Sequence, residues 1–98
     1  MNCKIILLES GMSLIGDLEG EEIVAKLRDA LQIMVSPDGK YMMIPLLYPL
    51  NKKAKDINVR DLHIMEVFDA EDGIVETYSN MILKIRSNLV VERPKIIQ

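Results

Sequence analysis

The sequence predicts a small all-β fold, a strongly bent five-stranded antiparallel sheet with one helix near the C-terminal end. Two features predict the sheet: a glycine-punctuated strand over 13–20, and a strong turn signal at 36–39 (Ser-Pro-Asp-Gly) that leads straight into an apolar stretch. One late amphipathic stretch predicts the helix. At 98 residues the chain fits a single domain. We place this domain over 1–98, with the sheet over about 2–68, the helix over about 72–86 and a tail over 87–98.

The composition is that of an aliphatic protein with an acidic balance. Hydrophobic residues make up 49% of the chain, with three Tyr, one Phe and no Trp, so seven Met fill gaps in an aliphatic core. The net charge is −3, and the pI is about 5.1. Binding to duplex nucleic acid depends on neutralising phosphates. We therefore expect no duplex DNA partner.

A single cysteine and the absence of a long apolar run limit the protein class further. Cys3 alone excludes an internal disulfide and a cysteine cage for a metal, and it fits a reducing compartment. No apolar run approaches the roughly 20 residues that a membrane helix needs, and we find no leader before the first predicted strand. We therefore expect a cytoplasmic protein without a membrane partner, a metal or a cofactor.

The first two predicted strands carry the bend. Residues 2–9 are apolar on both faces, which is typical of a strand covered on both sides. Gly11 supplies the positive φ of a tight turn. In the next strand Leu14 and Leu18 share one face. Gly16 lies between them, where a glycine permits a sharp bend or the close approach of another backbone.

The segment over 21–35 has two interpretations in its first part. Apolar residues at helical spacing and two acidic residues at its start favour a helix. Clusters of β-branched residues and the lack of a capping residue favour a strand. Helix and strand therefore stay open for 21–31. The turn that follows decides the later part, for which we predict a hairpin pairing Leu31–Val35 with Lys40–Ile44.

The second half of the chain completes the sheet and adds the helix. Lys40–Leu50 is apolar on both faces and contains Pro45, which cannot donate a backbone hydrogen bond and marks a sheet edge or a bulge. A bare apolar edge would aggregate, so we expect another subunit to cover it. Ile57–Phe68 alternates like a last strand. An acidic start at 69–72 predicts the helix, whereas the tail is either a strand or chain ordered against a neighbour.

The glycine-rich stretch has the spacing of a known motif. Gly11, Leu14, Gly16, Leu18 and Gly20 resemble the start of the first motif of the Sm and LSm proteins. Those proteins are small, strongly bent five-stranded barrels that assemble into rings and bind RNA. The resemblance implies that these five residues determine an Sm-like barrel and that the chain forms a homo-oligomeric ring.

Two later stretches extend the resemblance. Leu31–Val35 looks like the third strand of the family, and Val59–Ile64 looks like its second motif. The chain is also similar to short Sm-like proteins of marine tailed phages, which share its KIILL opening and its IPL strand. This similarity implies a bacterial or phage-infected host cytoplasm.

The resemblance also implies a site for single-stranded RNA. Family members stack a base on a side chain while an Asn and an Arg bind its edge or the phosphate. The matching positions here are Gln32, Arg60 and His63, with Asp29 just before the third strand. Gln offers the same two-sided hydrogen bonding as Asn on a longer arm.

Ordinary structural roles remain alternatives for these residues. His63 also fits a satisfied histidine on a strand face, and Arg60 also fits a surface partner of a nearby aspartate. Lys52 and Lys53 belong to the one basic run suited to attract an anion, although such a run is more often a solvated loop.

No catalytic constellation is present in the sequence. The one His and the one Cys lie about 60 residues apart, with no nucleophile and base at a useful spacing, so we predict a protein that is not an enzyme. Two functions remain open: an Sm-like homo-oligomeric ring that binds single-stranded RNA, and a phage accessory or structural interaction protein that keeps the barrel without RNA binding. The acidic charge, Gln32 and Asp61 favour the second.

Overall fold

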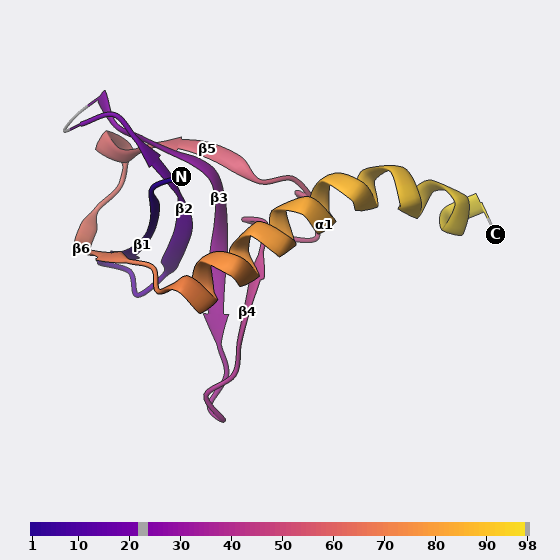
Figure 1. Cartoon of the computed structure of the whole chain (residues 1–98), viewed down its shortest axis with the longest axis horizontal. Helices are drawn as coiled ribbons and strands as arrows, with labels where there is room; N and C mark the ends of the chain where they lie inside the picture. Colours follow the sequence, from indigo (N-terminus) through magenta and orange to yellow (C-terminus); the bar gives the residue numbers. More distant parts are fainter. Residues whose placement is uncertain (22–23, 98) are drawn as a thin grey trace.

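The chain folds into one curved antiparallel sheet of six strands with a single long helix laid across it (Figure 1). The computed structural model describes residues 1–21 and 24–97. A mostly β fold with one C-terminal helix is therefore confirmed. The elements in chain order are β1 (Cys3–Leu8), β2 (Ser13–Glu19), β3 (Lys26–Val35), β4 (Tyr41–Ile44), β5 (Lys55–Asn58), a 3₁₀ turn (Val59–Asp61), β6 (Ile64–Asp69) and α1 (Asp72–Ile97).

The strand order within the sheet is β4-β3-β2-β1-β6, and β5 also pairs with β3. β3 is the longest strand, with ten residues, and it holds β4 along its later part and β5 along its earlier part. Within the described residues, β4 and β5 therefore form one outer side of the sheet and β6 forms the other. The outer edges of these strands decide what the sheet presents to a partner.

The turn and the bend predicted around the glycines of β2 are both present. Gly11 has φ +93° in the turn after β1, where its N–H donates to the carbonyl of Leu8. A Cβ on Gly16 would lie 2.7 Å from Cγ of Leu27 and 2.8 Å from the carbonyl oxygen of Arg28. The register between β2 and β3 shifts at this point. Gly16 is thus the place where β3 crosses β2 closely, and no larger residue fits there.

The open question over 21–31 is resolved as a strand from Lys26 onward, while residues 22–23 lie outside the described part. The predicted hairpin is confirmed, because β3 and β4 pair from Gln32 with Ile44 to Val35 with Tyr41.

The two long strands predicted for the second half are wrong, because each is interrupted. β4 ends at Ile44, immediately before Pro45, and the chain then turns before it returns to the sheet as β5. The side-chain amide of Asn51 holds this loop by donating to the carbonyls of Leu46 (2.9 Å) and Lys53 (2.8 Å). The predicted strand over 57–68 is likewise split by the 3₁₀ turn, so the described residues contain six strands and not five.

The helix begins at Asp72 as predicted but runs to Ile97, so the prediction of a separate tail over 87–98 is wrong. No glycine follows Gly73, and Pro94 lies too close to the end to stop the helix earlier. The C-terminal half of α1 extends well beyond the sheet (Figure 1). No described helix is both long and apolar enough to cross a lipid bilayer.

Side chains from the two faces of the sheet form two separate cores. One face carries the inner cluster (Ile6, Leu14, Leu27 and Ala30). The other face packs against α1 and carries the helix-side cluster (Cys3, Ile15, Leu31, Met43, Tyr78 and Ile82). Neighbouring residues along β1 and β2 alternate between the two clusters, as the period of a strand requires. The first half of α1 therefore closes one side of the sheet.

Candidate functional site

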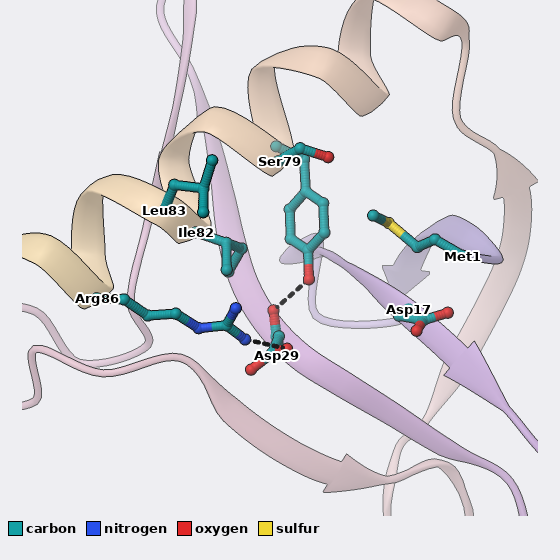
Figure 2. A pocket seen from close by; sticks show the side chains of 8 residues that line it. Met1, Asp17, Asp29, Ser79, Ile82, Leu83 and Arg86 are labelled. Atoms are coloured by element: carbon teal, nitrogen blue, oxygen red, sulfur yellow. Dashed lines mark hydrogen bonds and ion pairs between the residues drawn. The ribbon is translucent and has the colours of Figure 1, made fainter.

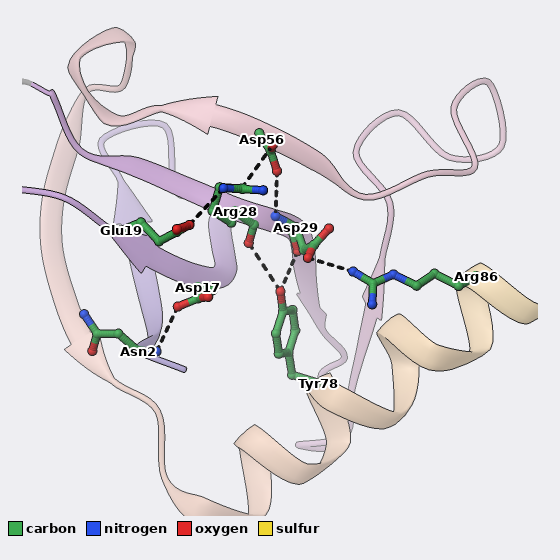
Figure 3. A network of polar contacts seen from close by, with 8 residues as sticks. All are labelled: Asn2, Asp17, Glu19, Arg28, Asp29, Asp56, Tyr78 and Arg86. Carbon is green, nitrogen blue, oxygen red and sulfur yellow. Dashed lines mark hydrogen bonds and ion pairs between the residues drawn. The ribbon is translucent and has the colours of Figure 1, made fainter.

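Asp29 lies in a network of polar contacts between β3, β5 and α1 (Figure 3). It lies at a bulge of β3 with φ 52°, in the left-handed region. Its N–H donates to Oδ1 of Asp56 at 3.0 Å, and its carbonyl accepts from Oη of Tyr78 at 2.7 Å. Its carboxylate accepts from Nη2 of Arg86 at 2.9 Å. One residue thereby joins β3 to β5 and to α1.

Charges around the bulge are paired with one another. Nη1 of Arg28 lies 2.9 Å from Glu19, and Nε lies 3.2 Å from Asp56. Asp56 first, and then Glu19, raise the pKa of Arg28. Burial, followed by the nearby carboxylate of Asp29, raises the pKa of Tyr78, so its hydroxyl stays a hydrogen-bond donor. The bulge is built as a structural joint.

Two pockets adjoin this joint. The larger, of about 400 Å³, lies between α1 and the bulge (Figure 2). Its polar groups are largely used within the protein, because Asp29 binds Arg86 and Asp17 accepts from the backbone N–H of Asn2 at 2.8 Å. The smaller pocket, of about 180 Å³, contains Lys53 beside the Asp29–Arg86 pair. The charges of Asp29 and Arg86, which line both pockets, are paired with each other.

The six residues of the predicted RNA site are distributed over the molecule. Asp29 and Lys53 line the smaller pocket, and Lys52 is an exposed neighbour in the loop before β5. Gln32 is half-buried in β3, opposite Leu14 and Ile44.

Arg60 and His63 lie in the exposed turn between β5 and β6, where Nδ1 of His63 is 3.6 Å from Glu9. Within residues 1–21 and 24–97, no hydrogen bond or ion pair joins Gln32, Arg60 or His63 to one another or to Asp29. RNA binding by these residues stays a prediction.

The edge of the sheet at β4 is apolar and exposed. Met42 is 56% exposed and Tyr41 41% exposed, and Val35 on the adjoining strand is 71% exposed. Together with Met34, Ser36 and Lys40, these residues line a groove of about 480 Å³ along the hairpin. Because β3 is the one strand that pairs with β4 in the described part of the chain, the other edge of β4 offers backbone groups without a partner strand there.

The opposite edge, at β6, has the same character. Among residues 1–21 and 24–97, β6 pairs with β1 alone, and Met65, Val67 and Phe68 are 63%, 44% and 43% exposed. The sequence analysis predicted a last alternating strand over Ile57–Phe68 and did not identify its exposed edge. The available signal was that Met65 and Val67 alternate with Glu66 and Phe68, which leaves neither face clearly polar.

Among the described residues, no group of His, Cys, Asp or Glu side chains could hold a metal ion. No protein-family model matches the chain, and no curated protein matches it. A proposal about its function therefore depends on the geometry of the fold.

Proposed function

We propose that this chain is a non-enzymatic interaction protein that assembles with copies of itself through the β4 edge of one copy and the β6 edge of the next. The observation that carries the proposal is that, within the described residues, β4 and β6 each pair with one strand and carry exposed apolar side chains. Soluble proteins usually protect such edges with charges, prolines or a covering element. Addition of a strand from another copy satisfies the backbone and buries the apolar side chains together.

The two edges belong to different strands, so the contact is heterologous. A repeated heterologous contact gives a closed ring when the rotation between copies closes and a filament when it does not. We propose the closed ring and an Sm-like barrel for each subunit. The glycine spacing of β2, the tight crossing at Gly16 and the sheet order support this proposal.

The mass in solution tests the assembly. Light scattering on a sizing column should give one discrete species whose mass is a whole multiple of the 11.1 kDa chain. The mass should not change over a tenfold dilution. A species of 11.1 kDa at all concentrations would refute the assembly.

A second function, binding of single-stranded RNA by the assembled ring, is favoured by the turn between β5 and β6. Arg60 is exposed there and makes no hydrogen bond or ion pair within the described residues, and His63 beside it exposes its ring. A cation next to a ring suits a phosphate and a stacked base.

Fluorescence anisotropy with labelled oligo-U and oligo-A, at low and moderate salt, tests the RNA function. We expect micromolar binding that weakens about tenfold in Arg60→Ala, because a phosphate contact is lost. Lys26→Ala, which removes another exposed cation, is the matched control. Absence of binding at low salt would leave assembly as the whole function.

A further inference from the structure

We propose a specific register for the contact between copies: β4 of one copy runs antiparallel to β6 of the next, with Tyr41 opposite Phe68 of the neighbouring copy. This inference rests on the proposed assembly and adds the residues that decide which alignment forms. In this register Met42 faces Val67 of the neighbour, and Lys40 faces its Asp69. It is derived from the faces and charges of the two strands.

The face of each edge residue follows from the pairing inside one copy. On β6, Phe68 lies opposite Ile5 and Val67 opposite Ile6. Ile5 packs on the helix-side cluster and Ile6 belongs to the inner cluster. Directly opposed residues share a face. Phe68 therefore lies on the helix side of the sheet and Val67 on the inner side.

The same argument places the residues of β4. Met43 pairs with Ile33, and both pack with the helix-side cluster, so Tyr41, two residues earlier, is on that side too. The hydroxyl of Tyr41 lies 3.5 Å from Oγ1 of Thr77 on α1, which agrees. Met42 is then on the inner side. A sheet that continues from one copy into the next keeps both faces continuous, so Tyr41 must meet a helix-side residue of β6.

Few antiparallel alignments meet this condition, and charge separates them. A shift of two residues in one direction places Tyr41 opposite Glu66 and Lys40 opposite Val67. The opposite shift places Met42 opposite Asp69. Every one of these registers sets a charge against an apolar side chain, and in the proposed one Glu66 lies opposite Met43. The two shifts differ from it because they leave Lys40 without an acidic partner on β6, and opposite charges favour a cross-strand pair.

The proposed register instead sets an aromatic residue against an aromatic one and Lys40 against Asp69. Asp69 already binds Lys4 within its own copy, and its side chain is 86% exposed, so it can accept a second cation. Two parallel alignments with matched faces would put Ile44 or Met42 opposite Asp69. Every strand pair in this sheet is antiparallel.

Engineered cysteines can distinguish these alignments. In a Cys3→Ala background, the pair Tyr41→Cys/Phe68→Cys should form disulfides between copies under mild oxidation. Directly opposed residues have Cα atoms about 4.5–5.5 Å apart, within disulfide range. The matched control, Tyr41→Cys/Glu66→Cys, sets its cysteines directly opposite each other only in the shifted register. In the proposed register these two positions are diagonal neighbours about 7 Å or more apart. We expect a ladder of cross-linked copies on a non-reducing gel for the first pair only.

The outcomes separate the register from the assembly. If the control pair cross-links and the proposed pair does not, the register is overturned while the assembly stands. If neither pair cross-links in a protein that light scattering shows to be assembled, pairing of β4 with β6 is overturned. If the unmodified chain is a monomer, the proposed function itself fails.

A charge exchange provides a second test that needs no cysteine. Lys40→Glu should weaken assembly about fivefold, because it faces Asp69 across the contact. The double variant Lys40→Glu/Asp69→Lys should recover most of that loss. Failure of the double variant to recover would contradict the proposed pair.

Discussion

Asp29 shows how much one residue can hold in place. Its N–H, carbonyl and carboxylate contact Asp56, Tyr78 and Arg86, which belong to two other elements. The bulge turns all three groups toward partners that a regular strand would direct elsewhere. The resemblance to an RNA-binding family implied that Asp29 belongs to an RNA site. The contacts of Asp29 in the single chain are those of a joint between β3, β5 and α1.

Because of the Tyr78 hydroxyl, the fold should lose stability at alkaline pH. The raised pKa of Tyr78 lies above its ordinary value of 10.0, so the stabilisation is complete below that value and is lost as the pH rises through the folded pKa. Urea unfolding between about pH 8 and pH 11 should show the free energy of unfolding falling at the alkaline end.

In Tyr78→Phe the free energy of unfolding should decrease less steeply with alkaline pH. At neutral pH the variant should be less stable than the original protein by about 1 kcal/mol, the usual contribution of one hydrogen bond. Equal alkaline slopes for the two proteins would contradict this account.

Gly16 gives the sharpest prediction for a single substitution. A Cβ there meets Leu27 and the backbone of Arg28 below 3 Å, so Gly16→Ala should lower the free energy of unfolding by about 1–3 kcal/mol. Gly73→Ala is the control, since a Cβ at Gly73 meets nothing within 4 Å, and it should stabilise α1 by up to about 1 kcal/mol. Chemical denaturation measures both. If Gly16→Ala left the free energy of unfolding unchanged, β2 and β3 could move apart to accommodate the added Cβ.

At the scale of elements, α1 is a layer added to a sheet that has its own inner core. Among the side chains that the structure describes, the inner cluster contains none from α1, whereas the helix-side cluster is completed by Tyr78 and Ile82. Cys3 lies beneath this layer with 8% exposure, and burial first, with Asp17 second, raises the pKa of its thiol. The reactivity of this thiol therefore reports how tightly α1 is seated.

Thiol labelling with a disulfide reagent should accordingly be slow in the unmodified protein. Ile82→Ala, which opens a cavity between α1 and the sheet, should speed labelling at least several-fold and cost about 2–5 kcal/mol. Leu83→Ala, at an exposed position of the same helix, should label at the original rate. Fast labelling of the original protein would show that the helix is loosely held.

The elements that the sequence predicted well are those set by local chemistry. The turn at 36–39 and the acidic start of α1 each rest on a few adjacent residues. The segment around β3 was ambiguous for a physical reason. Leu27 and Ala30 both enter the inner cluster because the bulge between them shifts the alternation, and a spacing of three imitates a helix.

The contacts of the candidate site lie beyond such local signals. Asp29 and Arg86 are 57 positions apart, so their pairing depends on how α1 crosses the sheet. The break between β4 and β5 depends likewise on Asn51, whose side chain replaces the lost ladder with loop hydrogen bonds. Apolar periodicity carries no information on either.

At the scale of the whole molecule, the two free edges matter most, and one charge should be enough to close an edge. Val67→Lys places a lysine on β6, a common device against strand pairing. We expect light scattering to show the 11.1 kDa chain for this variant. Leu83→Lys adds the same charge at an exposed position on α1 and should keep the assembled mass. Equal masses for the two variants would exclude the β6 edge as a contact.

Because β3 holds both β4 and β5, the loop between those strands leaves the sheet and returns to the same strand. Its length is therefore not fixed by the strand order. Leu50 at its tip is 90% exposed, and extra residues there would extend outward without moving either strand. In an assembly of identical copies, a peptide grafted at this tip would be displayed once per subunit, which makes the loop a natural attachment point for a multivalent scaffold.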